Sequence, residues 1–165
     1  MIIIPTCFPT IELIKLIDEL IAEDISLRDK IVIINDHSNN SEAELILNTL
    51  ESKGLKIIDN TNGKGKGSAI KKGVGYSTKH KSEFVVIADS DGQHKSKDII
   101  NIMKVGIEYD KFIIGSRNFD KKIPLRNRLG NKISSFLYFL ITNYKIKDCQ
   151  CGLRYVPNRY FNLLL

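Results

Sequence analysis

Short apolar runs alternate with helical stretches along most of the chain. The runs 1–4 and 31–34 are apolar at every position, which indicates strands with no face turned to water. Runs at 55–58, 84–88 and 112–114 are interpreted as three more strands. The pattern therefore predicts five strands separated by longer segments.

The segments between the strands have the spacing of amphipathic helices. In 11–22, apolar residues recur every three or four positions while charged residues occupy the other side. We expect Ser41 and Ser96 to cap the helices that they begin, and Pro5 to stop the first strand. Further helices are expected at 41–53, at 68–77, from 96 onward and at about 127–143.

Alternating strands and helices predict an α/β fold. We expect a mostly parallel, Rossmann-like sheet covered by helices on both faces, which makes a three-layer sandwich. In such sheets, ligands bind beyond the carboxyl ends of the strands. The residues expected to meet at that edge are Pro5, Thr6, Asn35, Asp36 and the segments 89–91 and 115–117.

Length and composition indicate one ordinary globular domain. The 165 residues are 42% hydrophobic and 27% charged, which excludes disordered, collagen-like and coiled-coil chains. The best apolar candidate for a membrane span, 133–141, is much shorter than the ~18–20 residues required. The N-terminus lacks the features of a secretory signal, so we expect a cytoplasmic location.

The net charge and the cysteines add little to the prediction of one globular domain. The formal charge is +6, but basic residues are interspersed with acidic ones along the chain, so charge alone identifies no partner. The three cysteines are odd in number and have no disulfide spacing, so reduced thiols are expected. The sequence contains no second Cys/His pair that would complete a structural zinc site with Cys149 and Cys151.

Two carboxylates directly follow the fourth strand. Asp89 and Asp91 flank Ser90 in a segment rich in oxygen donors that also contains Gln93. Mg²⁺ is usually held by one or two carboxylates together with substrate phosphate oxygens. An Asp-x-Asp pair is also common in solvated turns, but its place at the ligand edge of the sheet favours a metal site.

A glycine-rich segment, 62–69, resembles a phosphate loop without matching either common pattern. Gly67 stands where a Walker sequence has Ser or Thr, and the segment follows the third strand, whereas a dinucleotide fingerprint follows the first. Glycines before a helix still allow close approach of a phosphate, with charge added by Lys64 and Lys66. The alternative is a flexible basic turn.

Basic and aromatic residues follow the fifth strand. Arg117, Arg126 and Arg128 suit phosphate binding, although isolated arginines are commonly solvated surface residues. His37 and His94 are interpreted as polar loop residues rather than catalytic bases. The aromatic residues of the last helix, Phe136, Tyr138 and Phe139, are expected in the core, with lipid contact as the alternative.

Six segments, read in order, resemble the family 2 glycosyltransferases over nearly the whole chain. They are 2–6, 33–38, 62–65, 88–94, 115–117 and 148–154. The likeness is greatest to the dolichyl- or polyprenyl-phosphate mannosyl- and glucosyltransferase branch. The segments that occur together there are Asp-Gly-Gln-His at 91–94, Gly-Ser-Arg at 115–117, Arg-Leu-Gly-Asn at 128–131 and 148–154.

The resemblance implies a GT-A fold, a GDP-mannose or UDP-glucose type of donor, and inversion at the anomeric carbon. The donor-binding residues that it implies are Pro5, Thr6, Asp36, Gly63, Lys66, Asp89 and Ser90. Asp89, Asp91 and Gln93 would hold Mg²⁺ or Mn²⁺ on the diphosphate. Arg117, Arg128 and Ser134 would receive an acceptor phosphate.

The catalytic residues implied in this way are Asp91, Arg117 and Asp148. A phosphate acceptor is already an anion at neutral pH and needs no strong base, whereas a hydroxyl acceptor would require one. Asp148 is the candidate for that base. The metal would act as a Lewis acid on the departing diphosphate.

The sequence differs from the family pattern in three places. Cys7, Phe8 and Pro9 stand where an aromatic residue, Asn and Glu are usual, and Asn35 replaces the first Asp of a pair. The family also continues beyond the length seen here, often to membrane anchors. We expect residues 1–165 to be a single GT-A domain without that C-terminal extension, either truncated or docked on a membrane or a membrane-anchored partner subunit.

The sequence therefore predicts a metal-dependent hexosyltransferase of cell-envelope glycan synthesis, acting on a polyprenyl or dolichyl phosphate at the cytoplasmic membrane face. One alternative is transfer to a saccharide or cell-wall hydroxyl. Another is a truncated protein that binds a sugar nucleotide without catalysis. Nucleic acid is not an expected partner.

Overall fold

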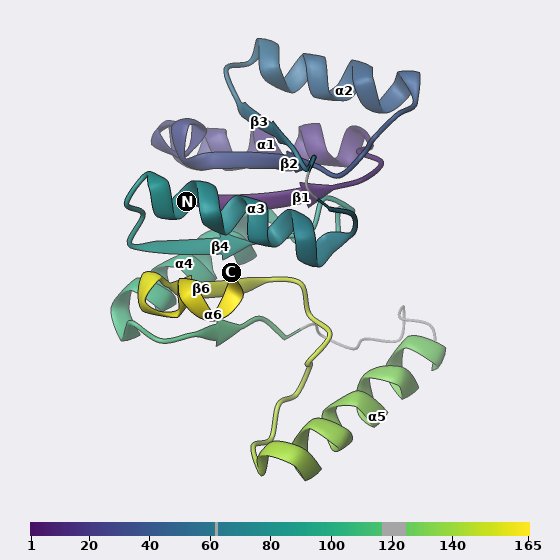
Figure 1. The fold of residues 1–165 in the computed structure, drawn as a ribbon, viewed down its shortest axis with the longest axis vertical. Coiled ribbons are helices and arrows are strands. Elements are labelled where there is room, and N and C mark those ends of the chain that lie inside the picture. Colours follow the sequence, from purple (N-terminus) through teal and green to yellow (C-terminus); the bar gives the residue numbers. More distant parts are fainter. Residues whose placement is uncertain (62, 117–124) are drawn as a thin grey trace.

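A computed structural model describes residues 1–61, 63–116 and 125–165, without the side chains of 125–129 and 132. The described residues form a six-stranded sheet with the order β3-β2-β1-β4-β6-β5 (Figure 1). The strands are β1 (Ile2–Thr6), β2 (Ile31–Asn35), β3 (Lys56–Asp59), β4 (Phe84–Ile87), β5 (Ile113–Ile114) and β6 (Arg154–Pro157).

Four neighbouring strands are parallel, and β6 runs against them. β1 pairs with β2 and β4, and β2 pairs with β3, all in parallel register. β6 is inserted antiparallel between β4 and β5, with Arg154 opposite Ile87. Strand β6 was not predicted, because Arg154 and Pro157 interrupt its apolar character and the strand is defined by its two neighbours. The prediction of a mostly parallel sheet is confirmed.

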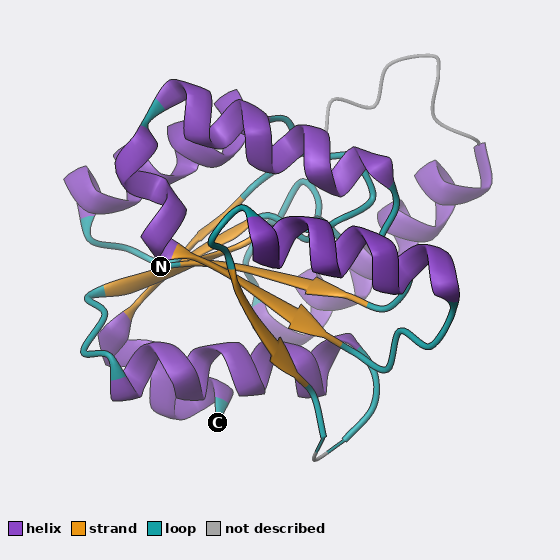
Figure 2. Ribbon diagram, turned by 90° about the horizontal axis from the view of Figure 1, so that it is seen from above, coloured by secondary structure: helices purple, strands orange, loops and turns teal. Residues whose placement is uncertain are grey.

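Helices cover both faces of the sheet, as Figure 2 shows. One face packs on α1 (Ile11–Glu23), α2 (Ser41–Ser52) and α4 (Ser96–Tyr109) through buried Leu, Ile and Val side chains. The other face packs on α3 (Lys66–Lys79) and the short α6 (Phe161–Leu164). Two 3₁₀ segments, η1 (Ile25–Lys30) and η2 (Asn158–Tyr160), complete this body. The expected three-layer sandwich is therefore present.

The first strand does not stop at Pro5, as the sequence suggested, but continues to Thr6. Odd-numbered residues of β1 turn their backbone polar groups toward β4, since the Ile3 carbonyl accepts from the Ala88 N–H at 3.1 Å. The pairing of β1 with β4 ends at Ile3. The missing N–H of Pro5 therefore breaks no hydrogen bond of the sheet.

Two expected helix caps are also wrong. Asn40, one residue before Ser41, caps α2, because its Oδ1 accepts a backbone N–H of the first turn at 2.7 Å. Ser96 is the first residue of α4, and its hydroxyl donates to Glu19 Oε2 at 2.9 Å instead of capping the helix. Asn and Ser are both good caps, so composition alone does not choose between neighbours.

Helix α5 (Leu125–Thr142) lies to one side of the sheet, apart from the three layers (Figure 1). The prediction that its aromatic residues belong to the core is wrong for Phe136 and Tyr138, which are both exposed. Among the described residues, no helix has the length and apolar character needed to cross a membrane.

Candidate functional site

The carboxyl ends of β1, β2 and β4 surround a cleft of about 260 Å³. Its described lining residues are Pro5, Thr6, Cys7, Asp36, Lys66, Asp89, Ser90 and Asp91. The cleft thus places three carboxylates beside one ammonium group, at the sheet edge where α/β proteins bind ligands.

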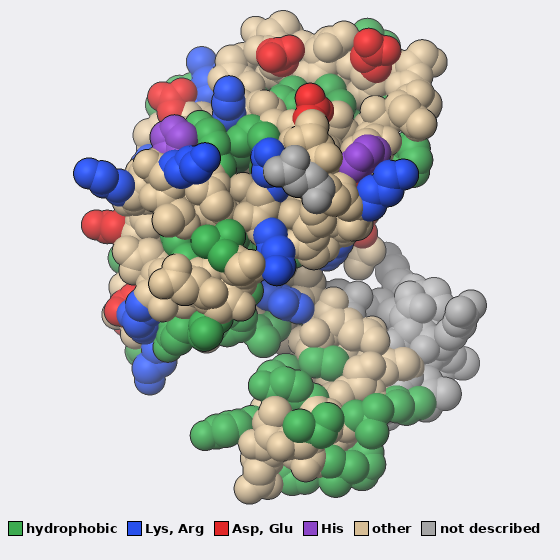
Figure 3. All heavy atoms as spheres, viewed as in Figure 1, with side chains coloured by type: hydrophobic (Ala, Val, Ile, Leu, Met, Phe, Trp, Pro, Cys, Tyr) green, Lys and Arg blue, Asp and Glu red, His purple; other side chains and the backbone are tan. Residues whose placement is uncertain are grey.

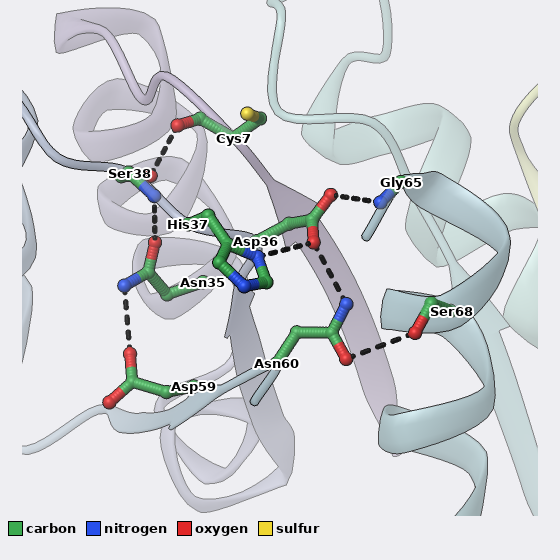
Figure 4. A network of polar contacts seen from close by, with 9 residues as sticks. All are labelled: Cys7, Asn35, Asp36, His37, Ser38, Asp59, Asn60, Gly65 and Ser68. Atoms are coloured by element: carbon green, nitrogen blue, oxygen red, sulfur yellow. Dashed lines mark hydrogen bonds and ion pairs between the residues drawn. The ribbon is translucent and has the colours of Figure 1, made fainter. Parts of the chain in front are cut away.

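Asp36 lies at the centre of a hydrogen-bond network that joins three loops (Figure 4). Its Oδ1 accepts from Asn60 Nδ2 at 2.8 Å and lies 3.3 Å from His37 Nδ1. Its Oδ2 accepts from the Gly65 N–H, also at 2.8 Å. The carboxylate therefore ties the end of β2 to the residue after β3 and to the start of α3.

Burial of Asp36, which is only 7% exposed, would by itself raise the pKa of its carboxyl. Hydrogen bonds from Asn60, His37 and Gly65 outweigh that effect and lower the pKa below its ordinary value of 3.8. Asp36 is therefore ionised at neutral pH and acts as an acceptor for the groups around it.

The neighbouring loop is fixed by a second set of contacts around Asn35. Its amide nitrogen donates to Asp59 Oδ1 at 2.8 Å, and its oxygen accepts from the Ser38 N–H at 3.0 Å (Figure 4). The Ser38 hydroxyl donates to the Cys7 carbonyl. Asn35, which replaces an expected Asp, thus orders the wall of the cleft.

Three groups surround the carboxylate of Asp89. Lys66 Nζ contacts its Oδ1, and His94 Nε2, on a side chain 6% exposed, lies 3.4 Å from its Oδ2. On the third side is the backbone of Gly152, where a Cβ would lie 2.0 Å from Asp89 Oδ2. Gly152 belongs to the segment that leads into β6, so the antiparallel strand helps to define the site.

Partial burial of Asp89 would raise its pKa, but His94 and Lys66 together lower the pKa to about 2. Lys66 can make this contact because α3 begins at Lys66, not at Ser68 as the sequence suggested. Gly65, the residue before the helix, has φ of 90°, a conformation that favours glycine.

Acid unfolding tests the Asp89 cluster. Because its folded pKa is depressed from 3.8 to about 2, the carboxylate stabilises the fold above about pH 4 and loses this contribution as the pH falls toward 2. The shift corresponds to about 2 kcal/mol of unfolding free energy. We expect urea unfolding to show a smaller loss over this pH range in Lys66→Gln than in the wild type. Equal losses in the two proteins would exclude Lys66 as a cause of the shift.

Asp91 is exposed at the cleft, and both of its carboxylate oxygens accept hydrogen bonds from Gln93. Its Oδ1 accepts the Gln93 N–H at 3.1 Å, and its Oδ2 accepts from Gln93 Nε2 at 2.6 Å. Within the described part of the chain, no three His, Cys, Asp or Glu side chains are arranged to hold an ion. Asp91 and Asp89 nevertheless line one cleft, which fits an ion whose remaining ligands come from a diphosphate. Joint coordination by Asp89, Asp91 and Gln93 stays a prediction.

Of the other predicted donor residues, Pro5, Thr6 and Ser90 line the same cleft, whereas Gly63 is not among its described lining residues. The Ser90 hydroxyl donates to Thr6 Oγ1 at 3.1 Å, which joins the ends of β4 and β1. Gly63 lies against Ser68, whose Oγ would be 2.3 Å from an added Cβ. Close packing therefore accounts for a glycine at this position.

The residues predicted for the acceptor and for catalysis are placed only in part. Ser134 Oγ, on α5, accepts from Gln150 Nε2 at 3.1 Å. Asp148 is 1% exposed, and its Oδ1 accepts the Gln150 N–H at 3.2 Å. Arg117 and the side chain of Arg128 lie outside the described residues.

Three residues of the site were missed or undervalued by sequence reasoning. Asn60 follows β3, and its position at a strand end was a usable signal. His94 was interpreted as a loop residue, but it is buried against Asp89. Gly152 lies 63 residues beyond Asp89, and only the strand pairing brings the two together.

Comparison with known proteins identifies the family to which this chain belongs. A family model described as "Glycosyl transferase family 2" matches residues 1–164. The dolichyl-phosphate beta-glucosyltransferase of Dictyostelium discoideum is 28% identical over an alignment of 155 residues that covers 86% of this chain and 46% of that protein. The UDP-N-acetylglucosamine–dolichyl-phosphate N-acetylglucosaminyltransferase of Methanococcus voltae is 33% identical over an alignment of 102 residues that covers 59% of this chain and 41% of that protein.

Solved structures agree on the fold. Glucosyl-3-phosphoglycerate synthase from Mycobacterium tuberculosis, in complex with Mn²⁺, UDP-glucose and phosphoglyceric acid, superposes with a TM-score of 0.67 at 12% identity. The match covers 96% of this chain and 56% of that one. The chain spans less than half the length of the two dolichyl-phosphate relatives. On the family match and the shared architecture, the chain belongs to glycosyltransferase family 2 and has the GT-A fold.

Proposed function

We propose that residues 1–165 form the single GT-A domain that binds a nucleotide-diphosphate hexose and transfers the hexose, with inversion, to a polyprenyl or dolichyl phosphate. The observation that carries this proposal is the cleft at the carboxyl edge of the sheet, where Asp89 and Asp91 lie beside Lys66. Carboxylates suit a divalent ion, and the ammonium group suits phosphate. The named dolichyl-phosphate relatives support this choice of acceptor.

The donor would lie across the ends of β1, β2 and β4. In this arrangement Pro5, Thr6 and Asp36 border the nucleoside, and Gly63 and Ser90 border the diphosphate. The first N–H groups of α3 attract an anion through the helix dipole. Lys66, which contacts Asp89, can form a second ion pair with the diphosphate.

Asp91, with Asp89 beside it, would hold Mg²⁺ or Mn²⁺ against the diphosphate, with Gln93 as the third predicted ligand. A bound ion would neutralise negative charge on the leaving group. The protein positions the acceptor oxygen in line with the bond that breaks. That oxygen forms the new bond to the anomeric carbon, and the electron pair of the old C–O bond leaves with the nucleoside diphosphate.

The acceptor side of the proposal favours a phosphate over a hydroxyl. Arg117, Arg128 and Ser134 are the groups proposed to receive it. A phosphate oxygen needs no proton removed before attack, whereas a hydroxyl needs a base with access to it. Asp148, the candidate base, is 1% exposed and already accepts the Gln150 N–H, which supports the phosphate acceptor.

Thermal unfolding with nucleotides tests the donor site. We expect either GDP or UDP, with its sugar conjugate, to raise the melting temperature in the presence of Mn²⁺. A ligand at a hundred times its Kd adds about 2.7 kcal/mol of stability. Asp91→Ala is expected to abolish the metal-dependent part of this shift, because Asp91 is the exposed carboxylate of the cleft. The absence of any shift in the wild type would contradict the proposed donor site.

Transfer assays distinguish the proposed transfer to a lipid phosphate from transfer to a hydroxyl and from nucleotide binding without catalysis. Labelled hexose recovered on a short-chain polyprenyl phosphate would support the proposal, and hexose recovered on a saccharide hydroxyl would replace it with the other enzymatic function. Metal-dependent nucleotide binding without transfer to either acceptor would indicate a binding protein that does not catalyse.

A further inference from the structure

Gln150 joins Ser134, on α5, to the carboxylate of Asp148. Its side-chain Nε2 donates to Ser134 Oγ, and its backbone N–H donates to Asp148 Oδ1, at 3.1 and 3.2 Å. Gln150 is exposed, whereas Asp148 is 1% exposed. Gln150 therefore stands between a residue proposed to receive the acceptor phosphate and a buried carboxylate.

The contact between Ser134 and Gln150 lies near the cleft. Figure 3 shows α5 and the segment after it as a lobe that projects from the body of the sheet. The backbone of Gly152 lies against Asp89, since an added Cβ would be 2.0 Å from Asp89 Oδ2. Gln150 is two residues before Gly152, so at most ~7 Å of chain separates their Cα atoms. A group bound at Ser134 and Gln150 would thus lie beside the carboxylates of the donor site.

The hydrogen bond between the two side chains leaves two protons for a ligand. A hydroxyl has one proton and two lone pairs, and an amide nitrogen has two protons. Because Ser134 Oγ is the acceptor in this bond, its own O–H can donate to another group. The second N–H of Gln150 Nε2 can also donate. The pair therefore presents two donors, which is what the acceptor-only oxygens of an ionised phosphate require.

The charges around this pair favour an anion. The side chains described for α5 and the segment after it are 130–131 and 133–150, and Asp148 is the only acidic residue among them. Its burial and its bond from the Gln150 N–H keep this carboxylate out of solvent. Lys145 and Lys147, in the same segment, are exposed. An anion near Gln150 would thus meet exposed positive charge and one buried negative charge.

We propose that Gln150 is an acceptor-binding residue, whose second amide N–H donates to the same phosphate as the Ser134 O–H. This inference rests on the proposed function, to which it adds a residue and a basis for specificity. Two donors facing one group bind a phosphate monoester better than the corresponding alcohol, because hydrogen bonds to a charged acceptor are the stronger ones. Gln150 acts in binding the acceptor, so it affects the KM of the acceptor and not that of the donor.

The isosteric variant Gln150→Glu tests this role most directly. It keeps the backbone N–H that Asp148 accepts but replaces the amide donors by a carboxylate, which accepts the Ser134 proton and repels a phosphate. We expect the KM of a short-chain polyprenyl phosphate to rise at least about tenfold, as for the loss of a hydrogen bond to a charged group. The KM of the sugar nucleotide should not change. The matched control is Asn101→Ala, which removes an exposed amide on α4 and should leave both KM values as in the wild type.

A double-mutant cycle tests whether Gln150 and Ser134 act on one ligand. Calorimetry without donor or metal measures the affinity for the polyprenyl phosphate and for the matching polyprenol. Ser134→Ala and Gln150→Ala should each weaken binding of the phosphate, and the double variant should lose less than the product of the two effects. Thr142→Ala, which removes a hydroxyl that donates within α5 to the Tyr138 carbonyl, should bind as the wild type does.

The outcomes separate this inference from the proposed function. Transfer by the wild type with an unchanged acceptor KM in Gln150→Glu would overturn the role of Gln150 and leave the function standing. Binding of the lipid phosphate that depends on Gln150, without transfer by the wild type, would support the phosphate site and contradict the function. Failure of the wild type to bind the phosphate, or equal affinity for the polyprenol, would overturn the inference.

Discussion

Replacing Gly152 by alanine is expected to lower the proposed hexose transfer at least a hundredfold while the fold is retained. The new Cβ would lie 2.0 Å from Asp89 Oδ2 and 2.5 Å from its Cγ, distances that real Cβ atoms do not show. The carboxylate must therefore move away from Lys66 and His94, which now hold it at the edge of the cleft. A displacement of about 1 Å in a catalytic site can cost about a hundredfold in rate.

Three measurements check this expectation. Transfer and metal-dependent nucleotide binding should both be impaired, and the carboxyl carbon of Asp89 should titrate by NMR at a pKa above the native value of about 2. The matched control is Gly75→Ala, because a Cβ at this helical glycine would make only one ordinary contact, 3.8 Å from Leu165. If Gly152→Ala binds nucleotide and titrates as the wild type does, the contact with Asp89 does not position the carboxylate.

Asp36→Asn is expected to lower the unfolding free energy by about 2–3 kcal/mol. The carboxylate accepts from Asn60 Nδ2 on one oxygen and from the Gly65 N–H on the other. Asn has one oxygen and one NH₂ group, so it would set a donor against a donor at one of these places. A buried donor without an acceptor costs about 1–3 kcal/mol, and bonds to charged groups are at the upper end.

Asp59→Asn is the matched control for this prediction. Asp59 also accepts a side-chain amide hydrogen bond, from Asn35 Nδ2, but through one oxygen and at an exposed position. Its replacement should cost less than about 0.5 kcal/mol. Urea unfolding of the wild type and the two variants at neutral pH measures these changes in unfolding free energy. Equal stability of Asp36→Asn and Asp59→Asn would show that the hydrogen bonds of Asp36 do not stabilise the loops.

The layers of this protein and the edge of the sheet where its site lies follow from the sequence alone. Short, fully apolar and β-branched runs such as 31–34 favour buried strands, and the helical spacing between them predicts helices that cover the faces of the sheet. Parallel strands end at one edge, so the sequence alone predicts that Asp36, Asp89 and Asp91 share one cleft, as the structure shows.

Which side chains contact one another depends on the pairing and packing of elements far apart in the chain. β6 is a strand because β4 and β5 flank it, and this pairing sets Gly152 against Asp89 across 63 residues of sequence. The orientation of α5 was also beyond the sequence, since its apolar stripe predicts burial but does not say against what. Periodicity reports which side of an element avoids water, whereas the partner of that side depends on contacts between residues far apart in the chain.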